Sequence, residues 1–386
     1  MTVRIDKLGV VIAALLAYGA FLAPFANFRA NRIVPGEVQP ILAALPSGLG
    51  VALMAFIAVA LVLIVLKTPT VLRLVLGLVA LLALAILIGL SAGHLTPPEN
   101  TYARVSPASG FWLTSFAFAL LTADALARLR PPPLARVALL AAVAAAAALI
   151  LMSGAWDGLS ILKEYGSRAG TFWLEASRHV VLALGSLAAA TLVGLPLGIL
   201  CHRVEALRAG VLNVLNIIQT IPSIALFGLL IAPLGWVALH VPGAAAIGIR
   251  GIGAAPAFVA LFLYSLLPVV ANTVVGLAGV PRDANDAARG IGMTDRQRLF
   301  GVELPLAFPV ILTGIRIVLV QNIGLATIAA LIGGGGFGVF VFQGIGQTAM
   351  DLVLLGAVPT VALAFAAAIV LDAATELSSN KPGRAA

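Results

Sequence analysis

The segment VPRDANDAARGIGMTDRQRLFGVELP, from Val280 to Pro305, separates two long apolar stretches of the chain. Eight of its 26 residues are charged, whereas charged residues make up 10% of the whole chain. The eight are Arg282, Asp283, Asp286, Arg289, Asp295, Arg296, Arg298 and Glu303. Because a charged side chain is costly inside a bilayer, this segment belongs in water, and the apolar stretches on either side belong in lipid.

The first half of this segment predicts a short amphipathic helix. Pro281 suits the first position of a helix, where its missing N–H is not needed. Apolar residues then recur at the spacing of one helical face, namely Ala284, Ala287, Ala288 and Ile291. Gly292 is expected to end the helix, because glycine adopts the left-handed conformation without strain.

The second half predicts another short helix that leads into a membrane span. Thr294 and Gln297 have the spacing of a capping box, in which each side chain satisfies a backbone N–H of the other residue. Pro305 is expected to open the next span. The product is a small amphipathic protrusion at the membrane surface, suited to docking into a groove on a partner protein.

The spacing within this segment also resembles a family motif. Asp-Ala-Ala at 286–288, three residues, Gly292, nine residues and then Val-x-Leu-Pro at 302–305 resembles the coupling loop of permease subunits of bacterial ABC importers. Asp286 replaces the usual Glu, and Val302 replaces the usual Ile. The resemblance implies that this loop docks on an ABC ATPase subunit through Asp286, Ala287, Ala288, Gly292, Leu304 and Pro305. The alternative is an ordinary amphipathic loop between two spans.

The composition places the chain among polytopic membrane proteins of the all-α class. Hydrophobic residues make up 61% of the 386 residues, and the mean hydropathy is +1.12, which excludes an ordinary soluble domain. About 20 apolar residues span a bilayer core. Ten stretches meet this length, namely 8–26, 47–66, 71–92, 110–127, 135–156, 179–201, 211–234, 256–279, 306–332 and 352–373.

The charge distribution predicts the orientation of these spans. With segment 280–305 in the cytoplasm, both termini are cytoplasmic, fifteen Lys and Arg residues lie inside and seven lie outside. This excess agrees with the positive-inside rule. The formal net charge of +8 is therefore a signal of membrane topology, and no nucleic-acid partner is implied.

The chain divides into two parts at the charged stretch 157–178, which is expected to lie outside. Residues 1–158 form a five-span module poor in polar residues, in which Asp124 either pairs with Arg128, one helical turn away, or marks an ion path. Residues 159–376 form the core, with coupling loop 280–305, and residues 377–386 form a cytoplasmic tail. The resemblance covers about residues 172–372 and implies the five-helix core of ABC type I importer permeases.

Polar residues inside the core predict a translocation path. The span at 211–233 carries Asn216, Gln219, Thr220, Pro222 and Ser223, of which the polar side chains share one helical face and Pro222 is expected to kink the helix. Hydrogen bonding between helices is the equal alternative. Further along the chain, a charge at Arg316 inside a span is expected either to face protein or water or to snorkel to the cytoplasmic side, and Gln321 and Asn322 are its candidate neighbours on the path. Gly194 and Gly198 predict a helix-packing face.

Two stretches narrow the resemblance to one subfamily. Residues 216–226, NIIQTIPSIAL, and residues 329–333, AALIG, are similar to permeases for glycine betaine, choline and related osmoprotectants. The formal G-x-G-x-x-G at 333–338 follows a membrane helix instead of a strand, so it does not predict a dinucleotide site. It predicts a mobile or re-entrant loop at the outer face.

The resemblance implies the permease subunit of an ABC importer in the bacterial cytoplasmic (inner) membrane. Its expected partners are an ABC ATPase subunit, an extracytoplasmic solute-binding protein, a second permease subunit and membrane lipid. No lysine follows a glycine, so the chain has no Walker A motif, and its four histidines lack metal-ligand spacing. No catalytic site, cofactor or metal is therefore predicted. The alternatives are a permease for another small solute, such as an amino acid, and an ion-coupled secondary transporter.

Overall fold

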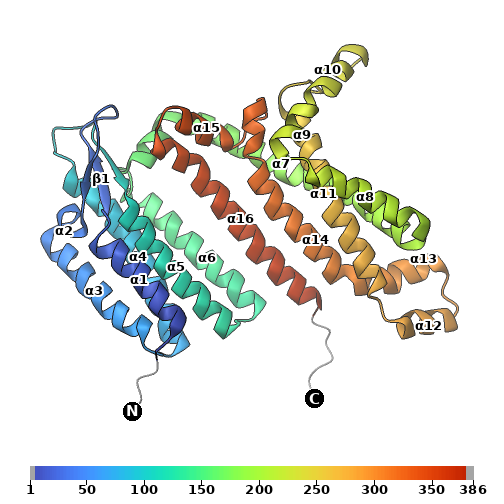
Figure 1. Ribbon diagram of the computed structural model, residues 1–386, viewed down its shortest axis with the longest axis horizontal. Helices are drawn as coiled ribbons and strands as arrows, with labels where there is room; N and C mark the ends of the chain where they lie inside the picture. The colour runs from blue at the N-terminus through green and yellow to red at the C-terminus, as the bar shows by residue number, and fades with distance from the viewer. Residues whose placement is uncertain (1–4, 380–386) are drawn as a thin grey trace. The chain divides into compact units, whose positions relative to one another are not determined.

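The computed structural model describes residues 5–379, which form two compact units that divide between Ser167 and Arg168 (Figure 1). The predicted boundary after residue 158 lies nine residues before the boundary between the units, inside the long helix α7. Most of the predicted tail, residues 380–386, lies outside the described residues.

The first unit is built from helices and one small sheet. Its elements are α1 (Lys7–Phe21), β1 (Ala26–Arg29), β2 (Glu37–Gln39), α2 (Ile41–Ala44), α3 (Ser47–Val65), α4 (Thr70–Leu95), β3 (Arg104–Pro107), α5 (Ser109–Leu129) and α6 (Pro133–Met152). The first predicted span, 8–26, was too long at its C-terminal end. The helix ends at Phe21, before Pro24, because the chain there turns into strand β1.

A three-stranded sheet caps one end of these helices, and the sequence analysis did not predict it. The strands are antiparallel in the order β2-β1-β3, with Phe28 opposite Glu37 on one side and Val105 on the other. The strands are only three or four residues long, too short to carry a clear alternating pattern. The all-α prediction is otherwise confirmed, since helices form both units.

A buried group of charges joins three helices at the other end of the first unit. Arg73 is 1% exposed, and its guanidinium lies 2.9 Å from Asp6 and 3.6 Å from Asp124. Asp124 also pairs with Arg128 at 2.9 Å, which confirms that predicted pair. Burial alone would raise the pKa of Asp6, but the N–H of Gly9 and the charges of Arg73 and Arg128 outweigh it and hold the pKa below its usual range. These contacts tie the start of α1 to α4 and α5.

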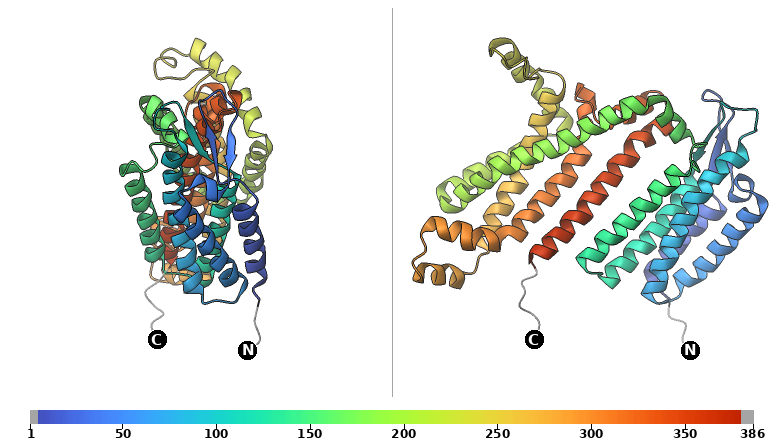
Figure 2. Two further views of the ribbon diagram at one scale, coloured as in Figure 1. Left: turned by 90° about the vertical axis from the view of Figure 1, so that its left-hand side faces the viewer. Right: turned by 180° about the vertical axis from the view of Figure 1, so that it is seen from behind.

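The second unit consists of helices, of which the longest run side by side (Figure 2). Its elements are α7 (Ser160–Arg203, which begins in the first unit), α8 (Glu205–Thr220), α9 (Ser223–Leu229), α10 (Ile231–His240), α11 (Ala254–Ala278), α12 (Arg282–Gly290), α13 (Asp295–Arg298), η1 (Leu299–Glu303), α14 (Leu304–Leu325), η2 (Ile328–Ile332), α15 (Gly338–Gly346) and α16 (Met350–Ser379). Stretch 157–178, expected as a loop, is helical from Ser160, with non-helical backbone at Arg168.

Close packing of α7 against α11 holds the centre of the second unit. A Cβ atom added at Gly198 would lie 2.5 Å from Cβ of Thr273, and one at Gly194 would lie 2.8 Å from a methyl group of Val269. Real Cβ atoms do not approach so closely, so only glycine allows this helix contact. The predicted packing face of Gly194 and Gly198 is confirmed.

Nine helices of the described residues are long and apolar enough to cross a membrane when α9 and α10 are counted together as Ser223–His240, and the 15-residue α1 is a shorter apolar helix. The ten predicted spans differ from these mainly at 211–234. That stretch is not one span, because it contains the second half of α8, the whole of α9 and the start of α10. The ninth predicted span was also too long, since α14 ends at Leu325 and residues 328–332 form a 3-10 helix.

Candidate functional site: a coupling segment and a polar helix break

The coupling segment, residues 280–305, joins α11 to α14 through two short helices. Pro281 takes the N-cap position, so helix α12 begins at Arg282, one residue later than predicted. Helix α13 continues through the π-helical turn η1 into α14, which starts at Leu304. Because no loop separates α13 from α14, the second short helix is a continuous extension of a membrane helix.

The turn between α12 and α13 has the predicted structure. Gly292 adopts a φ of +84°, the left-handed region in which a residue with a side chain is strained. The hydroxyl oxygen of Thr294 accepts the backbone N–H of Gln297 at 3.3 Å, and the side-chain oxygen of Gln297 accepts the N–H of Thr294 at 2.9 Å. The predicted glycine turn and capping box are both confirmed.

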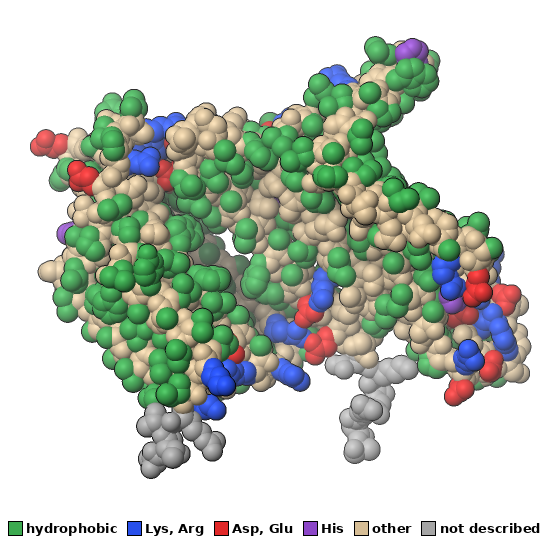
Figure 3. Space-filling model, in the orientation of Figure 1, with side chains coloured by type: hydrophobic (Ala, Val, Ile, Leu, Met, Phe, Trp, Pro, Cys, Tyr) green, Lys and Arg blue, Asp and Glu red, His purple; other side chains and the backbone are tan. Residues whose placement is uncertain are grey.

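The surface of the coupling segment is charged and also exposes large apolar side chains. Figure 3 shows acidic and basic side chains gathered over α12 and α13. Asp286 and Arg289 face each other at 3.8 Å in solvent, while Ile291 is 79% exposed and Phe300 is 64% exposed. The predicted apolar stripe is divided, because Ala288 is buried and Ala287 is exposed. An uncovered Ile and Phe beside exposed charges are what a partner protein would bury.

A buried carboxylate ties the coupling segment to the end of α7. Glu303 is 3% exposed, and its two oxygens accept from Arg298 at 3.0 Å and from Arg203 at 2.5 Å. Arg298 also pairs with Asp295 at 2.9 Å. This group was not predicted from the sequence. Charged residues at the ends of apolar stretches were visible, but Arg203 lies 100 residues from Glu303 and no local pattern predicts that pair.

The polar residues predicted to line a path cluster where α8 ends. Asn216 and Thr220 are exposed, and the amide of Gln219 donates to the carbonyl of Tyr264 on α11 at 2.7 Å. The predicted kink at Pro222 is instead a complete break: α8 ends at Thr220, and Pro222 is the N-cap of α9. Ser223 therefore begins a new helix and does not share a face with the α8 residues. The hydroxyl of Tyr264 donates to the carbonyl of Ile221 and so helps to hold the break.

The two predicted path residues on α14 lie in different surroundings. Asn322 is fully buried, and its amide donates to the hydroxyls of Ser186 on α7 and Ser265 on α11, both at 2.9 Å. Gln321 instead lines a groove of about 590 Å³ between α14 and α16. Asn322 is thus enclosed by three helices, whereas Gln321 is reachable from outside the unit.

Arg316 has a different neighbour from the one predicted. Its guanidinium pairs with the carboxylate of Asp372 on α16, in the groove that Gln321 also lines. Asn322 is not part of this group. The sequence did not predict this pair, because pairing between two helices with residues 56 positions apart has no sequence signature.

The glycine-rich stretch 333–338 is held against the N-terminal half of α7. Glu175 is 5% exposed, and its carboxylate accepts the N–H of Gly336 at 2.6 Å and pairs with Arg178 at 2.7 Å. Gly336 has a φ of +87°, so a side chain there would be strained. These contacts hold the stretch, which was predicted to be a mobile or re-entrant loop, against α7. Glu175 is a further residue whose role was not predicted from the sequence.

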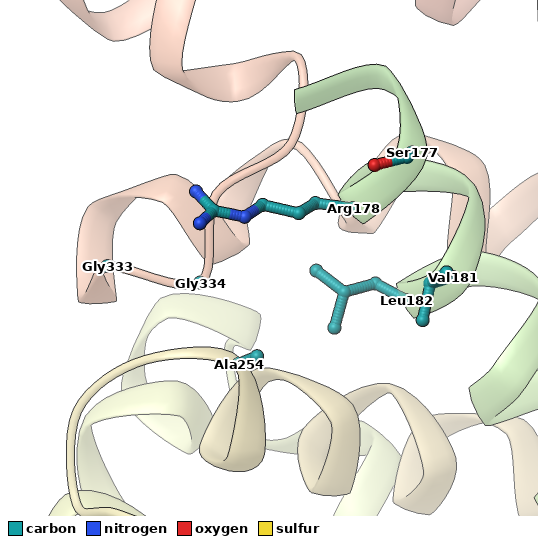
Figure 4. Close-up of a pocket in the computed structure, with 7 residues that line it drawn as sticks. All are labelled: Ser177, Arg178, Val181, Leu182, Ala254, Gly333 and Gly334. Atoms are coloured by element: carbon teal, nitrogen blue, oxygen red, sulfur yellow. The ribbon is translucent and has the colours of Figure 1, made fainter. Parts of the chain in front are cut away.

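A pocket of about 300 Å³ lies beside this stretch (Figure 4). In the view of Figure 4 the side chain of Arg178 extends across the pocket toward the backbone of the glycine stretch. The pocket is lined by Ser177, Arg178, Val181, Leu182, Ala254, Gly333 and Gly334. The walls of this pocket therefore consist of one charged side chain, Arg178, and small or apolar residues.

Comparisons with known proteins found two matching family models and similar solved structures. Residues 194–381 match the family described as "binding-protein-dependent transport system inner membrane component", and residues 6–162 match the "ABC transporter permease YehY, N-terminal domain". Among solved structures, a chain of the MetNI methionine ABC transporter aligns with a TM-score of 0.48 and 21% identity, over 55% of this chain and 98% of that chain.

Curated relatives are permease proteins of osmoprotectant and choline transport systems. The osmoprotectant import permease protein OsmW of Salmonella typhimurium is 44% identical over 50% of this chain and 84% of its own length. OsmY of the same organism is 43% identical over 55% of this chain and 83% of its own length. The choline transport system permease protein OpuBB of Bacillus subtilis is 36% identical over 57% of this chain and 93% of its own length. The chain therefore belongs to the family of binding-protein-dependent transport system inner membrane components, as a multi-span permease subunit of an ABC importer.

Proposed function

We propose that this permease takes up a quaternary-ammonium osmoprotectant of the glycine betaine or choline type. The identity of 44% to OsmW, over 84% of that protein, carries the proposal. The stretches NIIQTIPSIAL at 216–226 and AALIG at 329–333 support it from the sequence.

The proposed translocation path follows the break between α8 and α9. Asn216, Gln219, Thr220 and Ser223 supply polar side chains there, and broken helices with polar residues suit a path across a membrane. Gln321, which lines the groove between α14 and α16, is also proposed to line the path. Asn322 is assigned the packing role, because its hydrogen bonds to Ser186 and Ser265 satisfy its amide.

The proposed partners are an ABC ATPase subunit, an extracytoplasmic solute-binding protein and a second permease subunit. The ATPase docks on the coupling segment, where Asp286 and Ala287 are exposed on α12 and Gly292 sets the turn. ATP is hydrolysed on that separate subunit. Because the ATPase subunit is cytoplasmic in this proposal, the coupling segment that it contacts is cytoplasmic too, and the alternation of spans puts both termini on the same side. In this proposal residues 1–158 form a supporting module that lies outside the path, and residues 159–376 form the transporting core.

Uptake assays with competing solutes test the proposed substrate. Cells that lack other osmoprotectant importers and express this permease with its ATPase and binding protein are given labelled glycine betaine. Excess unlabelled choline or carnitine is expected to compete, and excess methionine is expected not to. If only amino acids compete, or if only an amino acid is taken up, the chain is a permease for that other class of solute.

A further inference from the structure

We infer that the ion pair between Glu303 and Arg203 transmits movement of the coupling segment to α7. This inference rests on the proposed docking of an ATPase on the coupling segment. It adds a positioning residue that acts after docking, between the docked surface and the membrane helices.

The first support is the placement of the carboxylate. Glu303 ends the π-helical turn η1, between the short helix α13 and the long helix α14. Such turns are uncommon and often mark functional positions. Since α13, η1 and α14 form a continuous helix, a force on α13 reaches α14 along the backbone and passes Glu303 on the way.

The second support is the use of both carboxylate oxygens. One oxygen accepts from Arg298, within the same continuous helix, at 3.0 Å. The other accepts from Arg203, the last residue of α7, at 2.5 Å. The Glu303 carboxylate is 4% exposed and Arg298 is 5% exposed, while Arg203 is 35% exposed, so water reaches only the Arg203 side of this group. A charge-assisted bond of this kind holds two elements in one geometry.

The third support is that apolar packing alone leaves the end of α7 free to slide. Leu195 and Ile199 of α7 pack beside Leu277 and Ile311, and such contacts have no fixed direction. The pair between Arg203 and Glu303 adds a directed contact just beyond them. Movement of α13 can then pull α7 as well as α14.

The nearby Arg208 provides a matched control. It lies at the same end of the unit and donates to the carbonyls of Cys201 and His202, and it also approaches Glu205 at 3.8 Å. All of these contacts lie on α7 and α8. Arg208 therefore stabilises the same region without touching the coupling segment.

The test compares Arg203→Gln with Arg208→Gln in the complete transporter with its ATPase and binding protein. In Arg203→Gln the Glu303 carboxylate keeps Arg298 as a partner, so the chain is expected to fold. The measurements are the ATPase-to-permease ratio after purification and the solute moved per ATP hydrolysed in vesicles. Arg203→Gln is expected to keep the ratio and to lower solute per ATP by about tenfold, the bias that one charge-assisted bond gives to a two-state equilibrium.

Further variants separate transmission from simple stability. Arg203→Lys keeps the charge and is expected to recover most of the coupling, and Arg208→Gln is expected to keep it fully. Normal solute per ATP in both Arg203→Gln and Glu303→Gln would overturn the inference, even with the ATPase bound. Loss of ATPase binding in Arg203→Gln would also overturn it, because Arg203 would then shape the docking site. Absence of an ATPase from the unaltered complex would instead contradict the proposed function.

Discussion

At the scale of single residues, burial separates roles that the sequence could not separate. Gln321 and Asn322 are adjacent polar residues in a membrane helix, and both were predicted to line a path. The structure places Asn322 among three helices and Gln321 in an open groove. The neighbours of a buried side chain come from helices more than 50 residues away along the chain. No local sequence pattern shows which of those helices will pack against it.

Replacing Asn322 by Ala is expected to lower the free energy of unfolding. The change leaves the hydroxyls of Ser186 and Ser265 without this amide, at a cost of about 1–3 kcal/mol. Gln321→Ala, at the neighbouring position, is the control and is expected to change stability by less than about 0.5 kcal/mol. Thermal unfolding of the purified variants in detergent measures both. Equal losses would show that the buried amide has no special role.

Replacing Arg73 by Met is expected to destabilise the first unit strongly. The change removes the buried cation that Asp6 and Asp124 share and leaves them only the half-exposed Arg128, and breaking a buried pair costs about 3–5 kcal/mol. Lys67→Met, at an exposed position of the same end, serves as the control. The yield of folded protein by size-exclusion chromatography and the unfolding temperature measure the effect. A stable Arg73→Met protein would show that packing alone holds these helices.

At the scale of elements, local signals were reliable and distant pairings were not. The glycine turn at Gly292 and the capping box at Thr294 depend on residues within a few positions, and the structure has both. The break at Pro222 was predicted only as a kink, because the contact of Tyr264 that helps to hold it comes from another helix. The short sheet strands were missed for lack of length.

Replacing Gly292 by Val is expected to weaken ATPase binding without affecting membrane insertion. A β-branched side chain is strained at a φ of +84°, so the turn that orients α12 against α13 would change. Gly290→Val is the matched control, because an added Cβ there has open space and Gly290 has no positive φ. Co-purification of the ATPase subunit measures the difference. The same ATPase ratio in both variants, with unchanged transport, would contradict the assignment of this segment.

At the scale of the whole molecule, composition and charge predicted a polytopic membrane protein, but not the limits of its parts. The predicted boundary at residue 158 lies inside the structured end of the first unit. Leu159 belongs to that unit's apolar core, and Lys163 donates to the carbonyl of Ala103 at 2.8 Å. The charged stretch 157–178 was used to divide the chain because helical residues that form buried ion pairs have the same composition as a solvated linker.

The proposed orientation predicts which positions are reachable from each side of the membrane. In a Cys201→Ala background, which removes the one native cysteine, Gly166→Cys is expected to react with an impermeant reagent from outside. Thr294→Cys is expected to react only after permeabilisation. Both positions are exposed, so burial does not confuse the comparison. The reverse labelling pattern would invert the topology.

ATP-driven import by this permease is measurable with purified components. Vesicles that contain the permease and its ATPase, with the binding protein outside, are loaded with ATP and given labelled glycine betaine. We expect accumulation that needs ATP on the side of the coupling segment, that stops when a non-hydrolysable analogue replaces ATP, and that persists after ionophores remove all ion gradients. Accumulation without ATP that an imposed ion gradient drives would contradict it and identify an ion-coupled transporter.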